Sequence, residues 1–296
     1  MNIFRKNNFE IIFEPKKKIK EQENIDNIKE HEQEHIDTTK EIDKEHSDKT
    51  KEKEQIYNYK KQNSDIRDFI YKYQSLELPV HYFIEEGPVF DQEDLGSCLA
   101  NATKVLINII SNGKINLSRL DLYNKYRLHE GANLEEDCGG SIRSVMKVIK
   151  MHGLYDESYW DYNIENFNKL VENSNEEHKI YLRDFKYIFI TQELEHIKEC
   201  LYNNYPILAA FSLYQNFESK ETITYGIVKM PEIDEPYLGK HAMLIIGYDD
   251  LSKHFKIRNS WGIDWGDTGH CYMPYEYVLN HELSFDLCTV MFEENV

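Results

Sequence analysis

The stretch QEDLGSCLAN, residues 92–101, decides how this chain is interpreted. It places the side-chain amide of Gln92 six positions before Cys98, with a Gly-Ser turn directly ahead of the cysteine. Apolar residues at helical spacing continue to residue 111, so we expect a helix whose first turn carries the thiol. The positive end of a helix dipole favours the thiolate, which is the nucleophilic form of cysteine. Taken alone, the stretch also fits a cysteine that simply packs in the interior.

Two further motifs supply what a cysteine nucleophile needs, namely a histidine to share its proton and a third group to orient that histidine. His241 opens the apolar stretch HAMLIIGY, and Asn259 begins NSWG after the strand-like residues 254–258. They lie 143 and 161 residues after Cys98 (241 − 98 and 259 − 98). The signature of papain and the cathepsins has a spacing of about 130 to 150 residues. From these motifs the chain resembles the papain family of cysteine peptidases, over roughly residues 78–296.

The resemblance implies a role for each matching residue. Gln92 matches the glutamine of the oxyanion hole, and Cys98 matches the nucleophile. His241 matches the general base, Asn259 its orienting partner, and Trp261 the indole that covers the His–Asn hydrogen bond. Each of these residue types alone has an ordinary structural explanation, so the assignment depends on their joint order and spacing.

The resemblance also implies a substrate-binding element and shows that one disulfide of the family is missing here. Gly139 and Gly140 match the family's substrate-binding glycines, because a peptide strand can approach the backbone closely only where no Cβ intervenes. The family carries a disulfide between two positions that are occupied here by Leu95 and Asp137. Both halves of that bridge are missing, which fits folding under reducing conditions.

The remaining composition limits the function classes. Five cysteines in a chain without a recognisable export signal make a disulfide framework improbable, and no CxxC pair indicates zinc. We therefore expect no metal and no cofactor, and interpret Cys138, Cys200, Cys271 and Cys288 as packed thiols. A net charge of −18 argues against nucleic acid as a partner. No apolar run is long enough for a membrane span, and the N-terminus lacks the pattern of a secretory signal. An intracellular location is favoured, and the expected partner is a polypeptide substrate.

Residues 1–75 are predicted to form a charged N-terminal extension. Residues 16–54 hold 23 charged side chains (10 basic, 13 acidic) among 39 residues, which is too polar for a core of their own. Apolar content rises again at 56–59 and 66–71, and these segments are suited to docking on the enzyme body. The extension is either a solvated tail or an inhibitory propeptide that occupies the cleft in cis. It lacks the motif of the cathepsin L-type prosegment.

The predicted fold class is α+β, within a catalytic domain at residues 76–296. Beyond the cysteine helix, we expect helices at 117–123, 141–151 and 192–202, the last capped by Thr191. Strands are expected at 205–214, 222–228, 242–248 and 254–258. Periodicity supports no more than α+β. The resemblance adds two lobes with a cleft at their junction: a helical lobe at about 90–185 and an antiparallel β-barrel lobe at about 186–296.

The resulting prediction is a cysteine endopeptidase made as a zymogen, acting through a thioester intermediate. Two other readings remain open at this point. One is a catalytically idle papain-like module that binds a partner, and the other is an isopeptidase or acyl transferase that uses the same triad. The intact set of Gln92, Cys98, His241 and Asn259 argues against the idle module.

Overall fold

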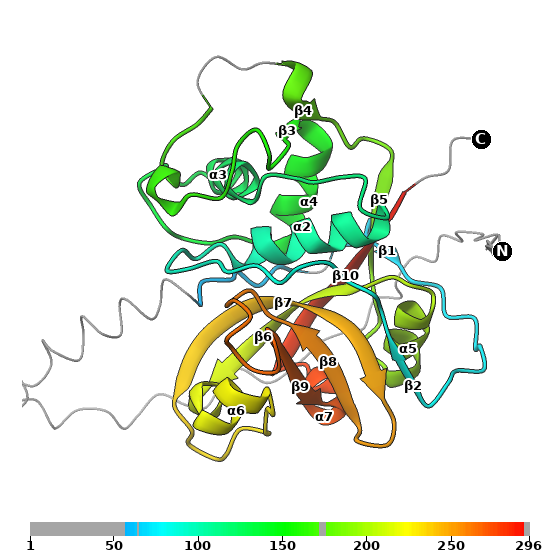
Figure 1. Ribbon diagram of the computed structural model, residues 1–296. Coiled ribbons are helices and arrows are strands. Elements are labelled where there is room, and N and C mark those ends of the chain that lie inside the picture. The colour runs from blue at the N-terminus through cyan, green and yellow to red at the C-terminus, as the bar shows by residue number, and fades with distance from the viewer. Residues whose placement is uncertain (1–56, 64, 172–175, 293–296) are drawn as a thin grey trace, which may run out of the picture.

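The computed structural model describes residues 57–63, 65–171 and 176–292. Most of the predicted extension, including the charged run at 16–54, lies outside these residues. The described chain contains both helices and strands, as the α+β prediction requires (Figure 1). The helices of five or more residues are α2 (Cys98–Ile110), α3 (Arg119–His129), α4 (Ile142–Met151), α5 (Leu194–Tyr202), α6 (Lys220–Tyr225) and α7 (Tyr275–Leu279).

The strands form one large sheet and one small one. The large sheet has eight strands in the order β1-β5-β10-β6-β7-β8-β9, with β2 paired to the end of β7. Its strands are β1 (Phe69–Ile70), β2 (His81–Phe83), β5 (Phe185–Phe189), β6 (Ile207–Tyr214), β7 (Tyr237–Asp249), β8 (His254–Arg258), β9 (His270–Pro274) and β10 (Ser284–Phe292). The small sheet pairs β3 (Leu154–Tyr155) with β4 (Lys179–Ile180).

The predicted closed antiparallel barrel is not observed among the described residues. The hydrogen-bonded path is open, because its end strands β1 and β9 do not pair with each other. The β1–β5 pair is also parallel, whereas the other pairs are antiparallel. Irregular register at three of these pairings bends the sheet, as β-bulges do, without closing it.

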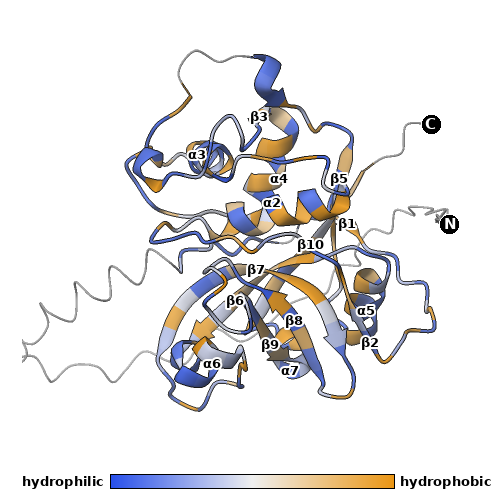
Figure 2. Ribbon diagram, viewed as in Figure 1, coloured by the Kyte–Doolittle hydropathy of each residue, from blue (hydrophilic) through white to orange (hydrophobic). Residues whose placement is uncertain are grey.

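Helix α2 forms where the apolar spacing predicted it, and it lies between the other helices and the sheet. In Figure 1, α3 and α4 pack on one side of α2, and β6, β7 and β10 lie on the other. Ten of its thirteen residues are buried, which is expected for a helix covered on two sides. Figure 2 shows apolar residues along α2, α4 and the central strands, with hydrophilic residues at the loop tips.

The helices predicted at 117–123 and 141–151 are observed as α3 and α4, and each begins directly after a serine cap. The hydroxyl oxygen of Ser118 accepts the backbone N–H of Asp121, and that of Ser141 accepts the N–H of Ser144. Each serine thereby satisfies one of the N–H groups that a helix start leaves without a partner.

Two local predictions were wrong. Residues 222–228 were expected to be a strand because of the run TITY, but residues 220–225 form α6. The caps override the β-branched composition: Ser219 Oγ accepts the N–H of Thr222, and Gly226 ends the helix in the left-handed conformation at φ 70°. Helix α5 begins at Leu194 rather than at residue 192, and it is not capped by Thr191. The side chain of Gln192 donates instead to the carbonyls of Val278 and Ser284.

A fully buried arginine holds the loop between α3 and α4, which carries the two predicted substrate-binding glycines. Arg127 donates to the carbonyl of Leu134 at 3.1 Å and to that of Glu136. It also donates to Asn124 Oδ1 at 2.7 Å and to the carbonyl of Phe167 at 2.6 Å. One cation thus fixes the loop against two neighbouring segments.

Replacing Arg127 by alanine should lower the free energy of unfolding by about 3 kcal/mol or more, because several buried carbonyls lose a charged donor. Denaturant unfolding followed by fluorescence measures this loss. The matched control is Arg67→Ala, since the Arg67 side chain is 86% exposed and pairs only at the surface with Asp65. Equal denaturation midpoints for the two variants would contradict this role of Arg127.

Candidate active site

Cys98 is the first residue of α2, and its sulfur lies beside strand β7. The backbone N–H groups of Ala242, the residue after His241, and of Leu99 lie near the sulfur and lower the pKa of the thiol. The cysteine is 1% exposed. The helix start and the adjacent strand therefore bring Cys98 next to the segment that carries the predicted histidine.

His241 is bound on one side and unpartnered on the other. Its Nε2 lies 2.8 Å from Asn259 Oδ1, and the same oxygen accepts the backbone N–H of Ser260 at 2.8 Å. An oxygen can only accept, so Nε2 carries the proton of the neutral ring and Nδ1 keeps its lone pair. Nδ1 is buried and has no hydrogen-bond partner among the described residues. The ring is thus oriented with its basic nitrogen available.

Trp261 lies against the imidazole, as the resemblance implied. The two ring centroids are 5.0 Å apart, at an interplanar angle of 37°. Trp261 is itself held by edge-on contacts with Phe217 and Trp265. The indole therefore packs against the ring that is bound to Asn259.

Gln92 is fully buried and held at both ends of its amide. Its Nε2 donates to the carbonyl of Leu95 at 2.9 Å, and its Oε1 accepts the hydroxyl of Ser260 at 2.6 Å. The backbone N–H of Gln92 also donates to the Ser260 carbonyl at 2.8 Å. The residue after Asn259 thus fixes Gln92, and this role of Ser260 was not predicted.

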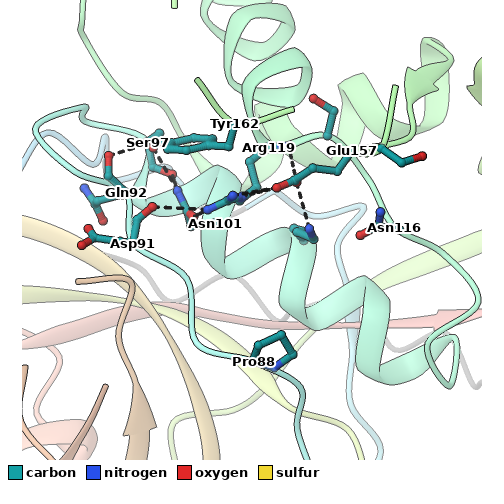
Figure 3. A network of polar contacts seen from close by, with 12 residues as sticks. Pro88, Asp91, Gln92, Ser97, Asn101, Asn116, Arg119, Glu157 and Tyr162 are labelled. Atoms are coloured by element: carbon teal, nitrogen blue, oxygen red, sulfur yellow. Dashed lines mark hydrogen bonds and ion pairs between the residues drawn. The ribbon is translucent and has the colours of Figure 1, made fainter. Parts of the chain in front are cut away.

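A buried polar network supports the turn between Gln92 and Cys98 from the side of α2 (Figure 3). The Tyr162 hydroxyl lies 2.5 Å from Ser97 Oγ and donates to the Gln92 carbonyl at 2.9 Å. Asn101 donates to Ser97 Oγ and accepts from Arg119, whose guanidinium is in turn paired with a carboxylate of Glu157. The backbone on both sides of the cysteine turn is therefore fixed.

The segment at the start of the described chain passes through this site. Residues 57–60, called the strap below, run between the α3–α4 loop and β7, as the blue trace between α2 and β7 in Figure 1 shows. The N–H of Lys60 donates to the Gly140 carbonyl at 3.0 Å, and the N–H of Tyr59 donates to the Lys240 carbonyl at 3.2 Å. The N–H of Lys240 donates to the Tyr57 carbonyl at 3.3 Å. The strap therefore forms backbone hydrogen bonds with the glycine loop on one side of the site and with β7 on the other.

Both predicted glycines have no room for a side chain. A Cβ on Gly139, whose φ is 60°, would lie 2.3 Å from the carbonyl oxygen of Asn58 in the strap. A Cβ on Gly140 would lie 2.7 Å from the ring of Tyr126. Gly139 thus permits close approach of an extended segment, whereas Gly140 is required by the packing beneath it.

Two tyrosines anchor the strap beside the site. The Tyr57 ring meets His241 and Trp261 edge-on, at centroid distances of 6.1 and 5.8 Å, and its hydroxyl donates to Glu218 at 2.9 Å. The Tyr59 hydroxyl donates to Asp286 at 2.8 Å. Both tyrosines are buried, so the strap covers the histidine and the tryptophan.

Comparison with known proteins agrees with this geometry. A model of the papain family cysteine proteases matches residues 83–286. The chain belongs to the papain family. It is 36% identical over 209 residues to an uncharacterized peptidase C1-like protein of Acanthamoeba polyphaga mimivirus, covering 66% of this chain and 67% of that protein. A viral cathepsin of Adoxophyes honmai nucleopolyhedrovirus is 30% identical over 190 residues, or 62% of this chain and 52% of the cathepsin.

Solved structures show the same papain-like fold. Xylellain, a cysteine protease from Xylella fastidiosa, superimposes with a TM-score of 0.70 at 29% identity, over 81% of this chain and 97% of that one. A procathepsin B of Trypanosoma congolense matches with a TM-score of 0.61 at 17% identity, over 82% and 88%, and shares the fold. This chain covers less than half the length of several curated relatives, such as a cathepsin C of Schistosoma mansoni.

Burial favours the neutral forms of the thiol and the imidazole while the strap is in place. Burial raises the pKa of Cys98 to about 11, although the N–H groups of Ala242 and Leu99 partly offset it. Burial lowers the pKa of His241 to about 4, against the opposing effect of the Asn259 hydrogen bond. The thiolate–imidazolium pair expected for an active papain-family site is therefore disfavoured in this covered state.

The other cysteines differ from Cys98 in their surroundings. Cys200, Cys271 and Cys288 are fully buried thiols whose pKa values are raised further by burial. Cys138 is half-buried beside the glycine pair, and all five cysteines are unbridged. Nowhere in the described ranges do three or more His, Cys, Asp or Glu side chains gather to hold a metal ion. None of the helices within those ranges has the length and apolar character needed to cross a membrane.

Alkylation of Cys98 in the full chain should depend steeply on pH. With the thiol pKa raised to about 11, the thiolate fraction grows roughly tenfold per pH unit from pH 6 to 9. We expect the rate of modification by iodoacetamide, read at the Cys98 peptide by mass spectrometry, to follow that slope. The half-buried Cys138 in the same digest is the internal control. A rate at Cys98 that levels off below pH 7 would show that the covered site already holds a thiolate.

Proposed function

We propose that this protein is a cysteine endopeptidase that hydrolyses peptide bonds with Cys98, His241 and Asn259. The observation that carries the proposal is the state of the imidazole. Nε2 is bound to Asn259, and Nδ1 is buried without a hydrogen-bond partner within the described part of the chain. The next residue, Ala242, lies beside Cys98, where its N–H lowers the pKa of the thiol. A ring held in this tautomer is suited to take the proton of the thiol.

In the proposed reaction, His241 Nδ1 accepts the Cys98 proton as the sulfur attacks the scissile carbonyl carbon. The carbonyl oxygen becomes negative and is met by Gln92 Nε2–H and the Cys98 backbone N–H. His241 then gives its proton to the leaving amine, which departs and leaves a thioester. Water, deprotonated by His241, hydrolyses the thioester and restores the thiol. Asn259 keeps the ring in place, and Trp261 keeps water from the His241–Asn259 pair.

The strap supports the further proposal that the protein is made as a zymogen. Its backbone pairs with Gly140 and with Lys240, where an extended polypeptide substrate would bind, and Tyr57 covers the histidine. The chain that follows forms no helix or strand from residue 72 to 80 and is mostly exposed there, although Glu199 accepts the N–H groups of Gln74 and Leu76. Cleavage in this exposed stretch would separate the strap from the catalytic body.

One ion pair makes strap binding sensitive to acid. Lys60 Nζ lies 3.0 Å from Glu130 Oε2, and Glu130 also accepts from Ser141. Burial raises the pKa of Glu130, but hydrogen bonds from Ser144, Lys60 and Ser141 outweigh it and leave the pKa below 4.5. A lowered pKa stabilises the bound form above pH 4.5, and this contribution is lost as the pH falls through the folded-state value. Acid therefore loosens the strap.

Replacing Cys98 by alanine should abolish both peptide hydrolysis and any self-trimming between residues 72 and 80. Gln92→Ala should lower kcat on the order of a hundredfold, because one of two oxyanion donors is lost. Peptide turnover and mass spectrometry of the acid-incubated chain measure the two effects. If the wild type is neither active nor labelled by a thiol-directed epoxide, the protein is an idle binding module. If the trimming persists in Cys98→Ala, another protease causes it.

Replacing Tyr59 by alanine should open the cleft. Removing a buried aromatic side chain costs about 3 kcal/mol, which corresponds to roughly a hundredfold shift toward the strap-open state. Initial peptide turnover by the full chain at neutral pH should rise accordingly. Tyr225→Ala is the matched control, because Tyr225 is 63% exposed and lies outside the strap. Unchanged initial turnover in an active Tyr59→Ala protein would show that the strap does not inhibit.

A further inference from the structure

The peptide unit that joins Leu95 to Gly96 is held at both of its polar ends. Its carbonyl oxygen accepts from Gln92 Nε2 at 2.9 Å and from the N–H of Ser97 at 2.7 Å. Its N–H donates to the carboxylate of Asp137, 3.0 Å from Oδ2 and 3.2 Å from Oδ1. Because a peptide unit is planar, fixing the direction of the N–H also fixes the direction of the carbonyl.

Asp137 is itself firmly placed. The hydroxyl of Tyr123 donates to Asp137 Oδ1, and Arg127 holds the carbonyl of the preceding residue, Glu136. The guanidinium of Arg127 also lies 4.2 Å from the centroid of the Tyr123 ring. Two residues after Asp137 the glycine pair begins. One carboxylate thus connects the loop that carries Gly139 and Gly140 to the turn that leads into Cys98.

We propose that Asp137 is a positioning residue for hydrolysis, which sets the direction of the Gln92 amide through the Leu95–Gly96 peptide. The inference rests on the proposed role of Gln92 as an oxyanion donor. The contact with Leu95 uses one of the two hydrogens on Gln92 Nε2 and leaves the other for the substrate oxygen. If the Leu95 carbonyl turned, the amide would turn with it, and the second hydrogen would no longer meet the developing charge.

The charge of Asp137 does not explain its presence beside the nucleophile. A carboxylate near a thiol disfavours the thiolate, and Asp137 is one of the groups that raise the pKa of Cys98. Its contribution to the site therefore comes through its hydrogen bonds. The variant Asp137→Asn separates the two effects, because asparagine keeps an oxygen that accepts the Gly96 N–H but carries no negative charge.

A double-mutant cycle in the full chain tests the proposal. The variants are Asp137→Ala, Gln92→Ala, the double variant and Asp137→Asn, with Glu135→Ala as an exposed carboxylate of the same loop for control. Turnover of one short peptide amide is normalised to the sites titrated with a thiol-directed epoxide. We expect Asp137→Ala to lower kcat by tenfold or more, but by less than twofold when Gln92 is already alanine. The kcat of Asp137→Asn should stay within threefold of the wild-type value, and the kcat of Glu135→Ala should equal the wild-type value.

Additive losses in the double variant would overturn the proposal, as would wild-type kcat for Asp137→Ala. If Gln92→Ala keeps wild-type kcat, the oxyanion assignment fails first, and Asp137 has nothing to position. Thermal melting checks that each variant is folded, and Asp137→Ser replaces the alanine variant if that one is not. Should neither fold, Asp137 is a structural residue and the positioning role is rejected.

Discussion

The packing of α2 against β7 is the contact on which the site depends. The helix carries Cys98 at its start, and the strand carries His241 and Ala242 at the point where the helix begins. Residues of α2 share one apolar core with Ala242 and Leu244. The strand has a side-chain period of two, so a shift of one residue along β7 would turn the imidazole to the opposite face. Both faces of β7 are buried, with Ala242 and Leu244 in one apolar cluster and Met243 and Ile245 in the other. The division of these residues between the two clusters therefore also fixes the position of the histidine.

Pairing between neighbouring strands brings Asn259 and Gln92 to the histidine on β7. In the register of β7 with β8, Leu244 is paired with Arg258, which brings the residue after β8, Asn259, within reach of His241. Ser260 is joined to Gln92 by two hydrogen bonds, one between their side chains and one between their backbones. A third hydrogen bond, from the Ser260 N–H to Asn259 Oδ1, holds the turn itself. Residues distant in the sequence are thus joined by a continuous series of backbone and amide contacts.

In the proposed zymogen, covalent attachment allows a four-residue strap to close the cleft. A segment that belongs to the same chain binds at a high effective concentration, so a few backbone hydrogen bonds and two buried tyrosines suffice. In addition to blocking substrate, the strap is associated with altered protonation of the catalytic pair. Tyr57 packs against the imidazole, and burial shifts the pKa values of Cys98 and His241 toward the neutral pair. In the proposed zymogen, removal of the strap exposes the side of the imidazole that Tyr57 covers.

The sequence predicted the elements whose signals are local and missed the contacts that depend on the assembled fold. The helix at Cys98 and the serine caps at residues 118 and 141 follow from spacing and short-range hydrogen bonding. The strand expected at 222–228 failed because two capping residues outweighed a β-branched run. Asp137 was noted only as a position without the family's cysteine. Its contact with Gly96 spans 41 residues and could not be read from either segment alone. The absence of a disulfide there was visible in the sequence, whereas the hydrogen bond that joins the same two loops required coordinates. A carboxylate held by Tyr123 can make this connection without oxidation, so the turn before Cys98 remains tied to the glycine loop even where thiols stay reduced.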